Sequence, residues 1–326
     1  PLDLVITELL APMLHDELLT SPAMVRDLLL RRLGQQAPEG LISRGLSLID
    51  MALWDAVARG ANKSLASLLG THSTTAPVML VAGYAIDNES DEAFADRLSE
   101  RVQEGWSAIK FAGNASQPDK FVRRLQMIRD HVGYKTPFMI DFHATYTSIE
   151  PFLKHARQLQ DLNVGWLEDP FPGSAHDLIG QARALSPIPI AIGDDVTSSL
   201  ALELLVEGSS IDVLRVDLLS IGGLSALANL VDRARRQNIL LSTHALPNFH
   251  HHLVLGRPGF GPVETFGPDS PWDGASKFVS PVPTTFDSRA GENVVKLPSG
   301  LGLGLIVDWE VVARYTRRYS QAPLVG

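Results

Sequence analysis

The sequence of 326 residues contains no cysteine. This absence excludes disulfide bonds, thiolate metal sites and a cysteine nucleophile, so any bound metal must use oxygen or imidazole ligands. Positive charge is also scarce, because 28 lysine and arginine residues stand against 37 aspartate and glutamate residues, for a formal net charge of −9. An acidic surface argues against nucleic acid or an anionic membrane as a partner.

Long apolar runs are missing as well. The longest, around Pro77–Ala85 and Pro187–Ile192, have the length of strands and not the roughly eighteen residues of a membrane-spanning helix. The chain opens without the features of a secretory signal, and its start at Pro1 rather than Met suggests further upstream residues. With 45% hydrophobic and 20% charged residues, the composition is that of a globular protein. We therefore expect a cytoplasmic protein that binds neither membrane nor nucleic acid.

Two kinds of pattern follow one another along the chain. Residues 2–69 carry apolar side chains at helical spacing, with glycine breaks at Gly34, Gly40 and Gly70. From Pro77 onward, short β-rich runs alternate with amphipathic segments, as in repeated βα units. The predicted strands are Pro77–Ala82, Ser107–Phe111, Pro137–Asp141, Val164–Glu168, Ile188–Asp194, Asp212–Asp217, Ile239–His244 and Pro262–Phe266. The clearest helices between them are predicted at Asp91–Gln103, Asp119–His131, Ile149–Leu162, Leu200–Glu207 and Ser225–Gln237.

Eight strands with crossovers favour an α/β fold with a parallel TIM-type barrel over an open doubly wound sheet. The last βα unit is truncated, because no helical pattern follows Phe266. A stretch punctuated by proline and glycine begins after Pro281 and leads to a short predicted helix near Asp308–Tyr319. We expect this tail to return to the N-terminal helices. The predicted organisation is a capping block at residues 1–74, a barrel at 75–281 and a tail at 282–326.

An ionisable side chain lies at or next to the end of each strand from the second to the eighth. Because the carboxyl ends of parallel barrel strands meet at one mouth, these side chains should converge where the active sites of such barrels lie. Taken singly, each strand-end carboxylate is typical of a helix cap or a solvated loop. The set is Lys110, Asp141, Glu168, Asp194, Asp217, His244 and Glu264.

Three consecutive strands in this set end in acidic residues. Asp141, Glu168 and Asp194 would bring like charges within a few ångströms, which is costly unless a cation lies between them. Three carboxylates without a thiolate favour Mg²⁺ over Zn²⁺. Asp195 competes with Asp194 as the third ligand, since the strand period does not decide between neighbours at a strand end.

Acid–base chemistry is the second expectation. His244 and Asp217 end adjacent strands, so the carboxylate can hold the imidazole in one tautomer as a general base requires, although a buried structural pair is the alternative. His143 lies two residues beyond Asp141 and should face the mouth, unless it is a surface loop histidine. Lys110 is either the partner of a substrate anion or a solvated strand-end lysine.

Other motifs are less informative. The run His250–His252 suggests a metal tag, but successive helical residues point in different directions, so we expect no shared ligand role. Gly222 and Gly223 form too short a motif for a phosphate loop and are expected to open the next helix. The sequence contains neither a Walker motif nor a Gly-x-Ser-x-Gly elbow.

Taken together, the segments resemble the enolase superfamily, specifically its mandelate racemase subgroup. The resemblance runs in order along nearly the whole chain. It implies a modified (β/α)₇β barrel, an α+β capping domain formed by the N-terminal block and the C-terminal tail, one Mg²⁺, and abstraction of the proton α to a carboxylate. The matching segments are Ser47–Gly60, Ser64–Gly70, Gly105–Gly113, Phe138–His143, Trp166–Pro172, Ile190–Asp195, Val216–Ser225, Ser242–Ala245, Val263–Phe266 and Pro298–Leu305.

The resemblance also implies a role for each residue. By position, His244 with Asp217 matches the base dyad, Glu264 matches the residue that hydrogen-bonds the substrate carboxylate, and Lys110 matches the first lysine of a Lys-x-Lys motif. The residues that match the three metal ligands are Asp141, Glu168 and Asp194. Relatives are homo-oligomers and carry capping strands that would precede Pro1, and we expect the same here.

Two departures from the family pattern refine the expected activity. Ala112 stands where racemases have a second lysine base, which argues against two-base racemisation. The third-strand motif Asp141-Phe142-His143 resembles that of galactonate dehydratase and related sugar-acid dehydratases, where this histidine is the general acid. The expected reaction is dehydration of a sugar acid to a 2-keto-3-deoxy acid. The alternatives are a racemase, epimerase or cycloisomerase, and a catalytically silent metal-binding relative. Asp194 is shorter than the usual glutamate, which keeps Asp195 open as a ligand.

Overall fold

A computed structural model describes residues 1–14, 21–36, 38–84, 89–267, 270, 272–281 and 283–316. The strands are β1 (Thr75–Gly83), β2 (Ile109–Ala112), β3 (Phe138–Asp141), β4 (Val164–Glu168), β5 (Ile190–Ile192), β6 (Val213–Val216), β7 (Leu240–Thr243), β8 (Phe260–Phe266), β9 (Val279–Ser280), β10 (Thr284–Asp287), β11 (Glu292–Lys296) and β12 (Ile306–Val307). The helices are α1 (Leu2–Leu4), η1 (Val5–Leu10), η2 (Ala11–Leu14), α2 (Pro22–Leu33), α3 (Gly40–Gly60), α4 (Leu65–Leu69), α5 (Asp91–Gln103), α6 (Pro118–Val132), α7 (Ile149–Leu159), α8 (His176–Leu185), α9 (Ser199–Glu207), α10 (Leu224–Arg236), α11 (Pro247–Gly256) and α12 (Trp309–Tyr315).

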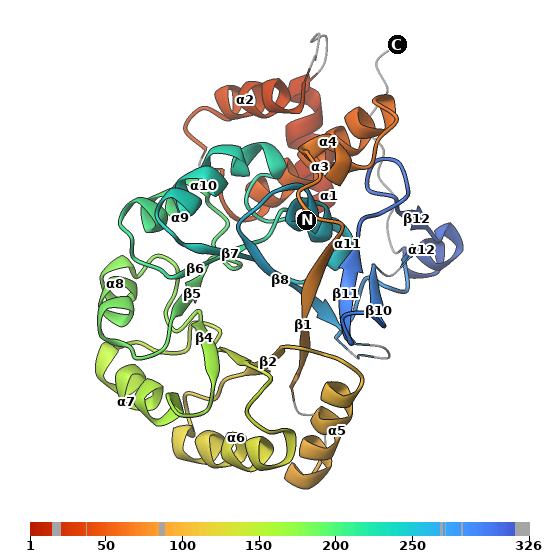
Figure 1. Ribbon diagram of the computed structural model, residues 1–326. Coiled ribbons are helices and arrows are strands. Elements are labelled where there is room, and N and C mark those ends of the chain that lie inside the picture. Colours follow the sequence, from red (N-terminus) through yellow and green to blue (C-terminus); the bar gives the residue numbers. More distant parts are fainter. Residues whose placement is uncertain are drawn as a thin grey trace.

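The strands β1 to β8 form a closed parallel barrel. They pair in chain order, and β1 also pairs with β8, which closes the ring. Helices α5 to α10 surround the ring from outside (Figure 1). The predicted barrel is therefore confirmed. The strand β5 is shorter than predicted, with only Ile190–Ile192 in the ladder, because the chain turns at Gly193 with φ of 146°. The helices α8 and α11 complete two βα units for which the sequence pattern offers no clear helix.

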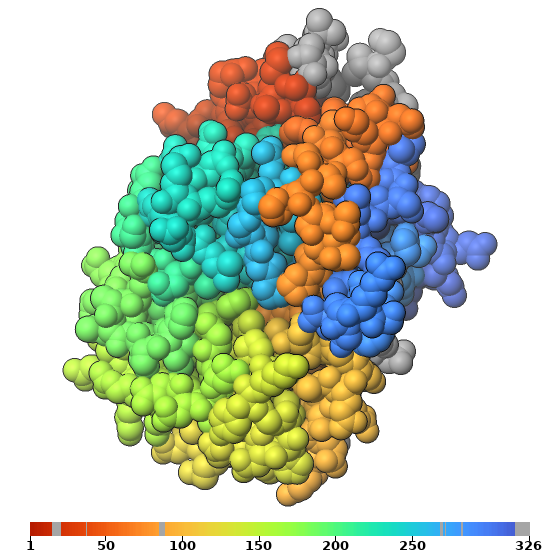
Figure 2. Space-filling model, viewed as in Figure 1, coloured from red at the N-terminus to blue at the C-terminus, as the bar shows by residue number. Residues whose placement is uncertain are grey.

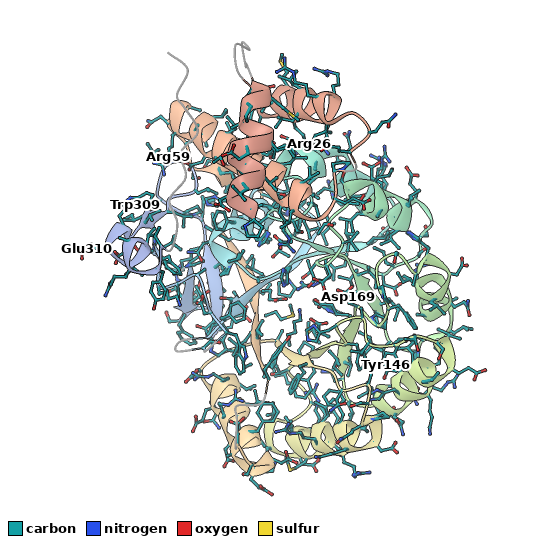
Figure 3. The ribbon with its side chains drawn as sticks, turned by 180° about the vertical axis from the view of Figure 1, so that it is seen from behind. Arg26, Arg59, Tyr146, Asp169, Trp309 and Glu310 are labelled. Atoms are coloured by element: carbon teal, nitrogen blue, oxygen red, sulfur yellow. The ribbon has the colours of Figure 1, made fainter. Side chains whose placement is uncertain are left out.

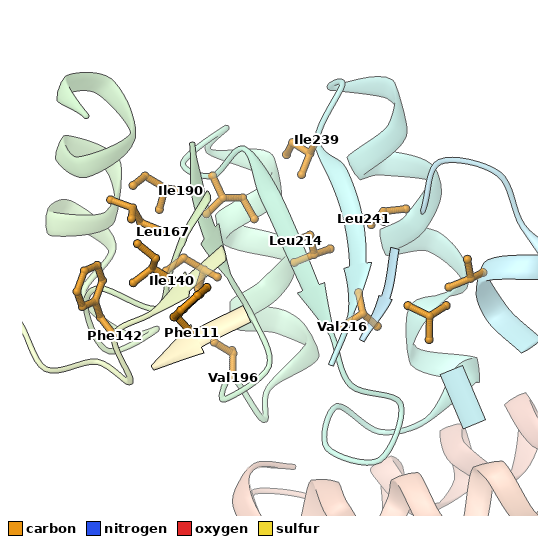
Figure 4. Close-up of a cluster of buried hydrophobic side chains, with 14 of the residues drawn as sticks. Phe111, Ile140, Phe142, Leu167, Ile190, Val196, Leu214, Val216, Ile239 and Leu241 are labelled. Carbon is orange, nitrogen blue, oxygen red and sulfur yellow. The ribbon is translucent and has the colours of Figure 1, made fainter. Parts of the chain in front are cut away.

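The barrel strands owe their two-sided character to a period of two residues. Outward-facing side chains such as Ile140, Leu167 and Leu214 form a continuous buried core with the surrounding helices (Figure 4). Alternate residues face the lumen instead. The part of the lumen nearer the N-terminal ends of the strands is filled by a separate buried cluster, as expected for a packed barrel rather than a pore. This cluster consists of Met79, Ala108, Met139, Trp166, Ala191 and Val213.

The C-terminal tail lies against the N-terminal helices and the first barrel strand. The hairpin β10–β11 extends the sheet, since β11 pairs antiparallel with β1. The backbone N–H of Leu65 donates to the carbonyl of Gly302 at 2.7 Å, and that of Leu303 donates to Asp55 Oδ1 at 2.6 Å. Figure 2 shows the corresponding orange and blue surfaces side by side. The tail thus returns as expected, while the boundaries at residues 74 and 281 stay predictions.

The helix α12 is shorter than the predicted segment. It spans Trp309–Tyr315, and residues 317–319 of the predicted helix lie outside the described residues. Figure 3 shows Trp309 and Glu310 on this helix at the outer edge of the molecule. Within the described ranges, no helix has both the length and the apolar character needed to cross a membrane.

Candidate active site

The lumen carries a second layer of side chains above the apolar one, and this layer is ionisable. Lys110, Asp141 and Glu168 each lie two residues beyond a member of the apolar cluster and therefore face the same interior. All three are almost fully buried. Asp217 and His244 follow directly after β6 and β7, Asp194 follows β5 after the intervening Gly193, and Glu264 lies within β8. The contacts described below join all seven predicted strand-end residues into one cluster.

The three predicted metal ligands form a compact buried triad. Each of Asp141, Glu168 and Asp194 offers a carboxylate oxygen, and these oxygens lie within 4.8 Å of one another. The register of β3 and β4 places Asp141 directly beside Glu168. One oxygen of Asp194, Oδ1, is buried without a hydrogen-bond partner. Such a set of hard oxygen donors can hold a divalent cation.

The geometry favours Asp194 over Asp195 as the third ligand. Asp194 is 6% exposed and belongs to the triad, whereas Asp195 is exposed. The turn that directs Asp194 inward requires Gly193, because a Cβ there would lie 2.1 Å from the carbonyl oxygen of Arg215. The glycine thus allows β5 to approach β6 closely at the end of the strand.

Lys110 lies among the carboxylates and is not a solvated strand-end lysine. Its Nζ is 2.6 Å from Glu168 Oε1, 3.0 Å from Asp141 Oδ2 and 3.3 Å from Glu264 Oε2. Burial acts to lower the pKa of Lys110, but the charges of Glu168, Glu264 and then Asp141 hold the pKa well above its ordinary value. The ammonium group therefore stays charged.

A second buried cation, Arg215 on β6, was not predicted. Its Nε lies 3.1 Å from Glu168 Oε1, and its Nη2 pairs with Glu264 Oε2. Burial raises the pKa of Glu168 to about 7, against the opposing charges of Arg215 and Lys110. Burial also acts to raise the pKa of Glu264, but Lys110 and Arg215 hold that pKa below its ordinary value. The strand period offers a signal for Arg215, which lies two residues before Asp217 and so shares its face.

His244 and Asp217 form the predicted dyad. His244 Nδ1 lies 3.3 Å from Asp217 Oδ2, and His244 Nε2 lies 3.5 Å from Asp194 Oδ2. The backbone N–H of Leu219 donates to the other Asp217 oxygen at 2.8 Å, which fixes the carboxylate. A third of the His244 side chain remains exposed, unlike a buried structural pair.

The electrostatics of the dyad favour the ion pair. Burial acts to lower the pKa of His244, but the hydrogen bond to Asp217 and the charges of Glu264 and Asp194 raise it to about 9. Burial acts to raise the pKa of Asp217, but the hydrogen bond with His244 holds it far below its ordinary value. Asp217 therefore remains a carboxylate that increases the basicity of its partner.

His143 follows β3, and its exposed side chain contacts both Asp141 and Tyr84. Its backbone N–H donates to Asp141 Oδ1 at 2.9 Å, and its Nδ1 lies 3.2 Å from the same oxygen. Its Nε2 lies 3.3 Å from the hydroxyl of Tyr84, which the sequence did not single out. The side chain is 49% exposed. The tethers distinguish it from a free surface histidine, and the exposure leaves it accessible to a ligand.

Asp169 is a further buried acid next to the triad (Figure 3). Burial and the adjacent charge of Asp194 hold the pKa of Asp169 well above its ordinary value. Its position after Glu168 puts it outside the strand period, so no sequence pattern distinguishes it from a loop acid.

The histidines of residues 250–252 have separate partners. His250 Nε2 accepts from the backbone N–H of Leu218 at 2.9 Å and thereby supports the loop of Asp217. His251 Nδ1 lies 2.6 Å from the carbonyl of Pro247, and His252 Nε2 lies 3.0 Å from that of Leu303. The expectation that they share no ligand role agrees with this arrangement. In the part of the chain that the structure describes, the acidic triad is the one group with metal-ligand spacing.

Comparisons with known proteins agree with this geometry. The sequence model described as enolase C-terminal domain-like matches residues 93–311, more than half of the chain. The chain is 28% identical over 221 residues to L-talarate/galactarate dehydratase of Salmonella typhimurium, covering 67% of this chain but only 54% of that enzyme. It is 26% identical over 278 residues to 3,6-anhydro-alpha-L-galactonate cycloisomerase of Streptomyces coelicolor, covering 84% of this chain and 73% of that enzyme.

Among solved structures, the fold is similar to that of L-talarate dehydratase from Polaromonas sp. JS666, crystallised with Mg and L-glucarate. The TM-score is 0.85 at 22% identity, and the alignment covers 97% of this chain and 85% of that one. This likeness shows a shared fold.

Proposed function

The chain belongs to the enolase C-terminal domain-like family, and we propose that it is a Mg²⁺-dependent sugar-acid dehydratase. It would remove the proton α to a carboxylate, eliminate the β-hydroxyl as water and release a 2-keto-3-deoxy acid. The observation that carries the proposal is the contact between the base dyad and the metal triad, where His244 Nε2 lies 3.5 Å from Asp194 Oδ2. The proposed proton acceptor and the triad thus share one mouth of the barrel.

The triad fits Mg²⁺ by charge as well as by donor type. When all four are ionised, the buried carboxylates of Asp141, Glu168, Asp194 and Glu264 exceed the buried cations Lys110 and Arg215 by two charges. One divalent ion would balance this excess, and Asp194 Oδ1, which has no hydrogen-bond donor, is suited to ligate it. Asp141, Glu168 and Asp194 would hold the ion. When bound, Mg²⁺ supplies positive charge that stabilises the negative charge developing on the substrate carboxylate.

We assign proton abstraction to His244. In its neutral form, Nε2 would take the α proton, while Asp217 accepts the hydrogen bond from Nδ1–H and stabilises the imidazolium that results. A cation held by the triad would favour that neutral form, because it offsets the charges of Asp194 and Glu264 that raise the pKa of His244. Lys110 would contact the substrate carboxylate as its charge increases. Glu264, 3.3 Å from Lys110, would have to carry a proton to donate a hydrogen bond to that carboxylate.

We assign the second half of the reaction to His143. Its imidazolium would donate a proton to the β-hydroxyl, and the electrons of the broken C–O bond would leave with the water molecule. Asp141 on one ring nitrogen and Tyr84 on the other orient the ring for this step. The enol that remains would tautomerise to the keto acid.

The second candidate is isomerisation without loss of water. It is favoured by the similarity to the cycloisomerase, whereas Ala112 in place of a second lysine argues against a two-base racemase. The third reading, a catalytically silent relative, would still bind the metal.

One experiment separates these candidates. The protein is incubated with Mg²⁺ and a panel of mono- and diacid sugars in D₂O, and both keto-acid formation and α-deuterium incorporation are followed. Keto acid from any member supports dehydration and identifies the substrate. Deuterium incorporation alone moves the function to isomerisation, and a protein that binds Mg²⁺ but acts on no member of the panel contradicts the proposal.

The proposal includes two further expectations. We infer a small carboxylate as the partner of the site and self-association into a homo-oligomer in the cytoplasm, both on the family resemblance. Light scattering coupled to size exclusion tests the oligomer, and a monomeric mass would contradict it.

A further inference from the structure

We propose that Arg215 is a positioning residue that holds Glu168 and Glu264 in fixed orientations, so that these carboxylates are aligned before metal or substrate binds. This inference rests on the proposed function, because it concerns the residues to which that function assigns metal and substrate binding. Arg215 is fully buried and projects into the barrel lumen from β6.

One guanidinium group connects four barrel strands. Its Nη1 donates to Ser242 Oγ at 2.6 Å and to the carbonyl of Thr243 at 2.7 Å, both on β7. Its Nη2 pairs with Glu264 on β8. Its Nε lies 3.1 Å from Glu168 Oε1 on β4, which is an ion pair without hydrogen-bond geometry. Arg215 is thereby anchored to the backbone on one side and to both glutamates on the other.

Glu168 shows what this contact achieves. Its Oε1 lies between Lys110 Nζ at 2.6 Å and Arg215 Nε at 3.1 Å, and its Oε2 accepts from Trp166 Nε1 at 3.0 Å. Both oxygens therefore have fixed partners from different strands. A carboxylate held in this way does not need to reorient when a ligand binds, which is how supporting contacts set the affinity and geometry of a metal site.

A lysine could not do the same. The planar guanidinium has donors pointing in several fixed directions, whereas an ammonium group on a flexible stem acts as a point charge. Lys110 already contacts the same two glutamates from β2. Arg215 adds directional hydrogen bonds to Glu264 and to β7, and a second positive charge beside Glu168. The variant Arg215→Lys therefore keeps the charge and removes the geometry.

Arg129 on α6 is a natural matched control. It is fully buried too, but its donors all go to backbone carbonyls, those of Leu162, Gly133, Thr136 and Asn163. It contacts none of the proposed site residues through these bonds. Arg129→Lys thus tests the loss of a buried guanidinium alone, and Arg215→Lys tests the loss of one that orients carboxylates.

The experiment measures Mg²⁺ affinity by calorimetry on the full chain without substrate. It also measures kcat and KM for the sugar acid that the wild-type protein dehydrates. We expect Arg215→Lys to weaken Mg²⁺ binding by about 10- to 100-fold and to lower kcat. We expect Arg129→Lys to lower the melting temperature and leave the Mg²⁺ affinity unchanged. A folded Arg215→Lys protein with wild-type Mg²⁺ affinity and kcat would overturn the proposal.

Ser242→Ala decides the question if Arg215→Lys does not fold. It removes one anchor of the guanidinium and leaves both glutamates paired, so we expect a weaker effect on Mg²⁺ affinity in the same direction. Wild-type affinity and kcat in Ser242→Ala would then count against the proposal. Failure of the wild-type protein to bind Mg²⁺ would contradict the proposed function itself, which distinguishes the two failures.

Discussion

The hydroxyl of Tyr84 lies 3.3 Å from Nε2 of His143, the ring nitrogen opposite the one that contacts Asp141. Tyr84 lies just after β1 and His143 just after β3, so the contact spans the mouth of the barrel. An imidazole held at both nitrogens has a restricted orientation. We therefore treat Tyr84 as the residue that helps to aim His143.

Tyr84→Phe removes this contact and keeps the ring. Since a single hydrogen bond contributes about 1 kcal/mol, we expect kcat for dehydration to fall about fivefold, with α-proton exchange in D₂O unchanged. The control is Tyr134→Phe, because the Tyr134 hydroxyl contacts only Gln126 among the described hydrogen bonds. Equal effects of the two substitutions on kcat would contradict the role of Tyr84.

The neighbouring acids Asp194 and Asp195 allow a paired test of the metal site. Asp194 belongs to the buried triad and Asp195 is exposed. We expect Asp194→Asn to weaken Mg²⁺ binding by more than about 100-fold and Asp195→Asn to change it little, as measured by calorimetry. The opposite ranking would reassign the ligand to Asp195.

Asp217→Asn tests the dyad. The carboxylate fixes the tautomer of His244 and stabilises its protonated form, so we expect kcat to fall by about 100-fold or more with little change in Mg²⁺ affinity. Single-turnover measurement of α-proton exchange checks this. Unchanged exchange would show that the pair is structural.

We expect the folded protein to lose stability in acid, because it buries histidines in their neutral form. Burial lowers the pKa of His155 from 6.5 to about 4 and that of His252 from 6.5 to about 4. The unfolded chain therefore binds protons that the folded chain does not, so stability is highest above about pH 6.5 and falls as the pH decreases towards about 4. In this window, each such histidine lowers the free energy of unfolding by about 1.4 kcal/mol for each unit by which the pH decreases.

Urea unfolding at a series of pH values measures the slope of the free energy of unfolding against pH. His155 is the better target for substitution, because its Nε2 is buried without a partner and its ring lies against Phe142 and Phe121. We expect His155→Phe to reduce this slope by the amount that corresponds to one bound proton, about 1.4 kcal/mol per pH unit. An identical slope in the variant would show that His155 is already protonated in the folded protein.

The sequence predicted the barrel and the convergence of its site for a physical reason. The period of two residues fixes which side chains face the lumen, and one acidic or basic residue per βα unit marks the mouth, as for Asp141 and Glu168. Arg215 follows the same period and could have been found by extending it back from Asp217.

Other features depend on contacts that no local pattern records. Asp169 and Tyr84 acquire their roles from what folds against them, namely Asp194 and His143. The inward direction of Asp194 depends on the close approach of Gly193 to β6, which is a property of packing between strands distant in sequence. The hairpin β10–β11 likewise joins the sheet where the first residues of β1, Thr75–Pro77, extend beyond the barrel pairings.

The most direct test of the account compares His143→Asn with His244→Asn on the sugar acid that the wild-type protein dehydrates, with Mg²⁺ in D₂O. The account predicts that His143→Asn still incorporates α-deuterium but forms almost no keto acid, whereas His244→Asn does neither. Keto acid formed at the wild-type rate by His143→Asn, or undiminished α-deuterium incorporation by His244→Asn, would contradict it.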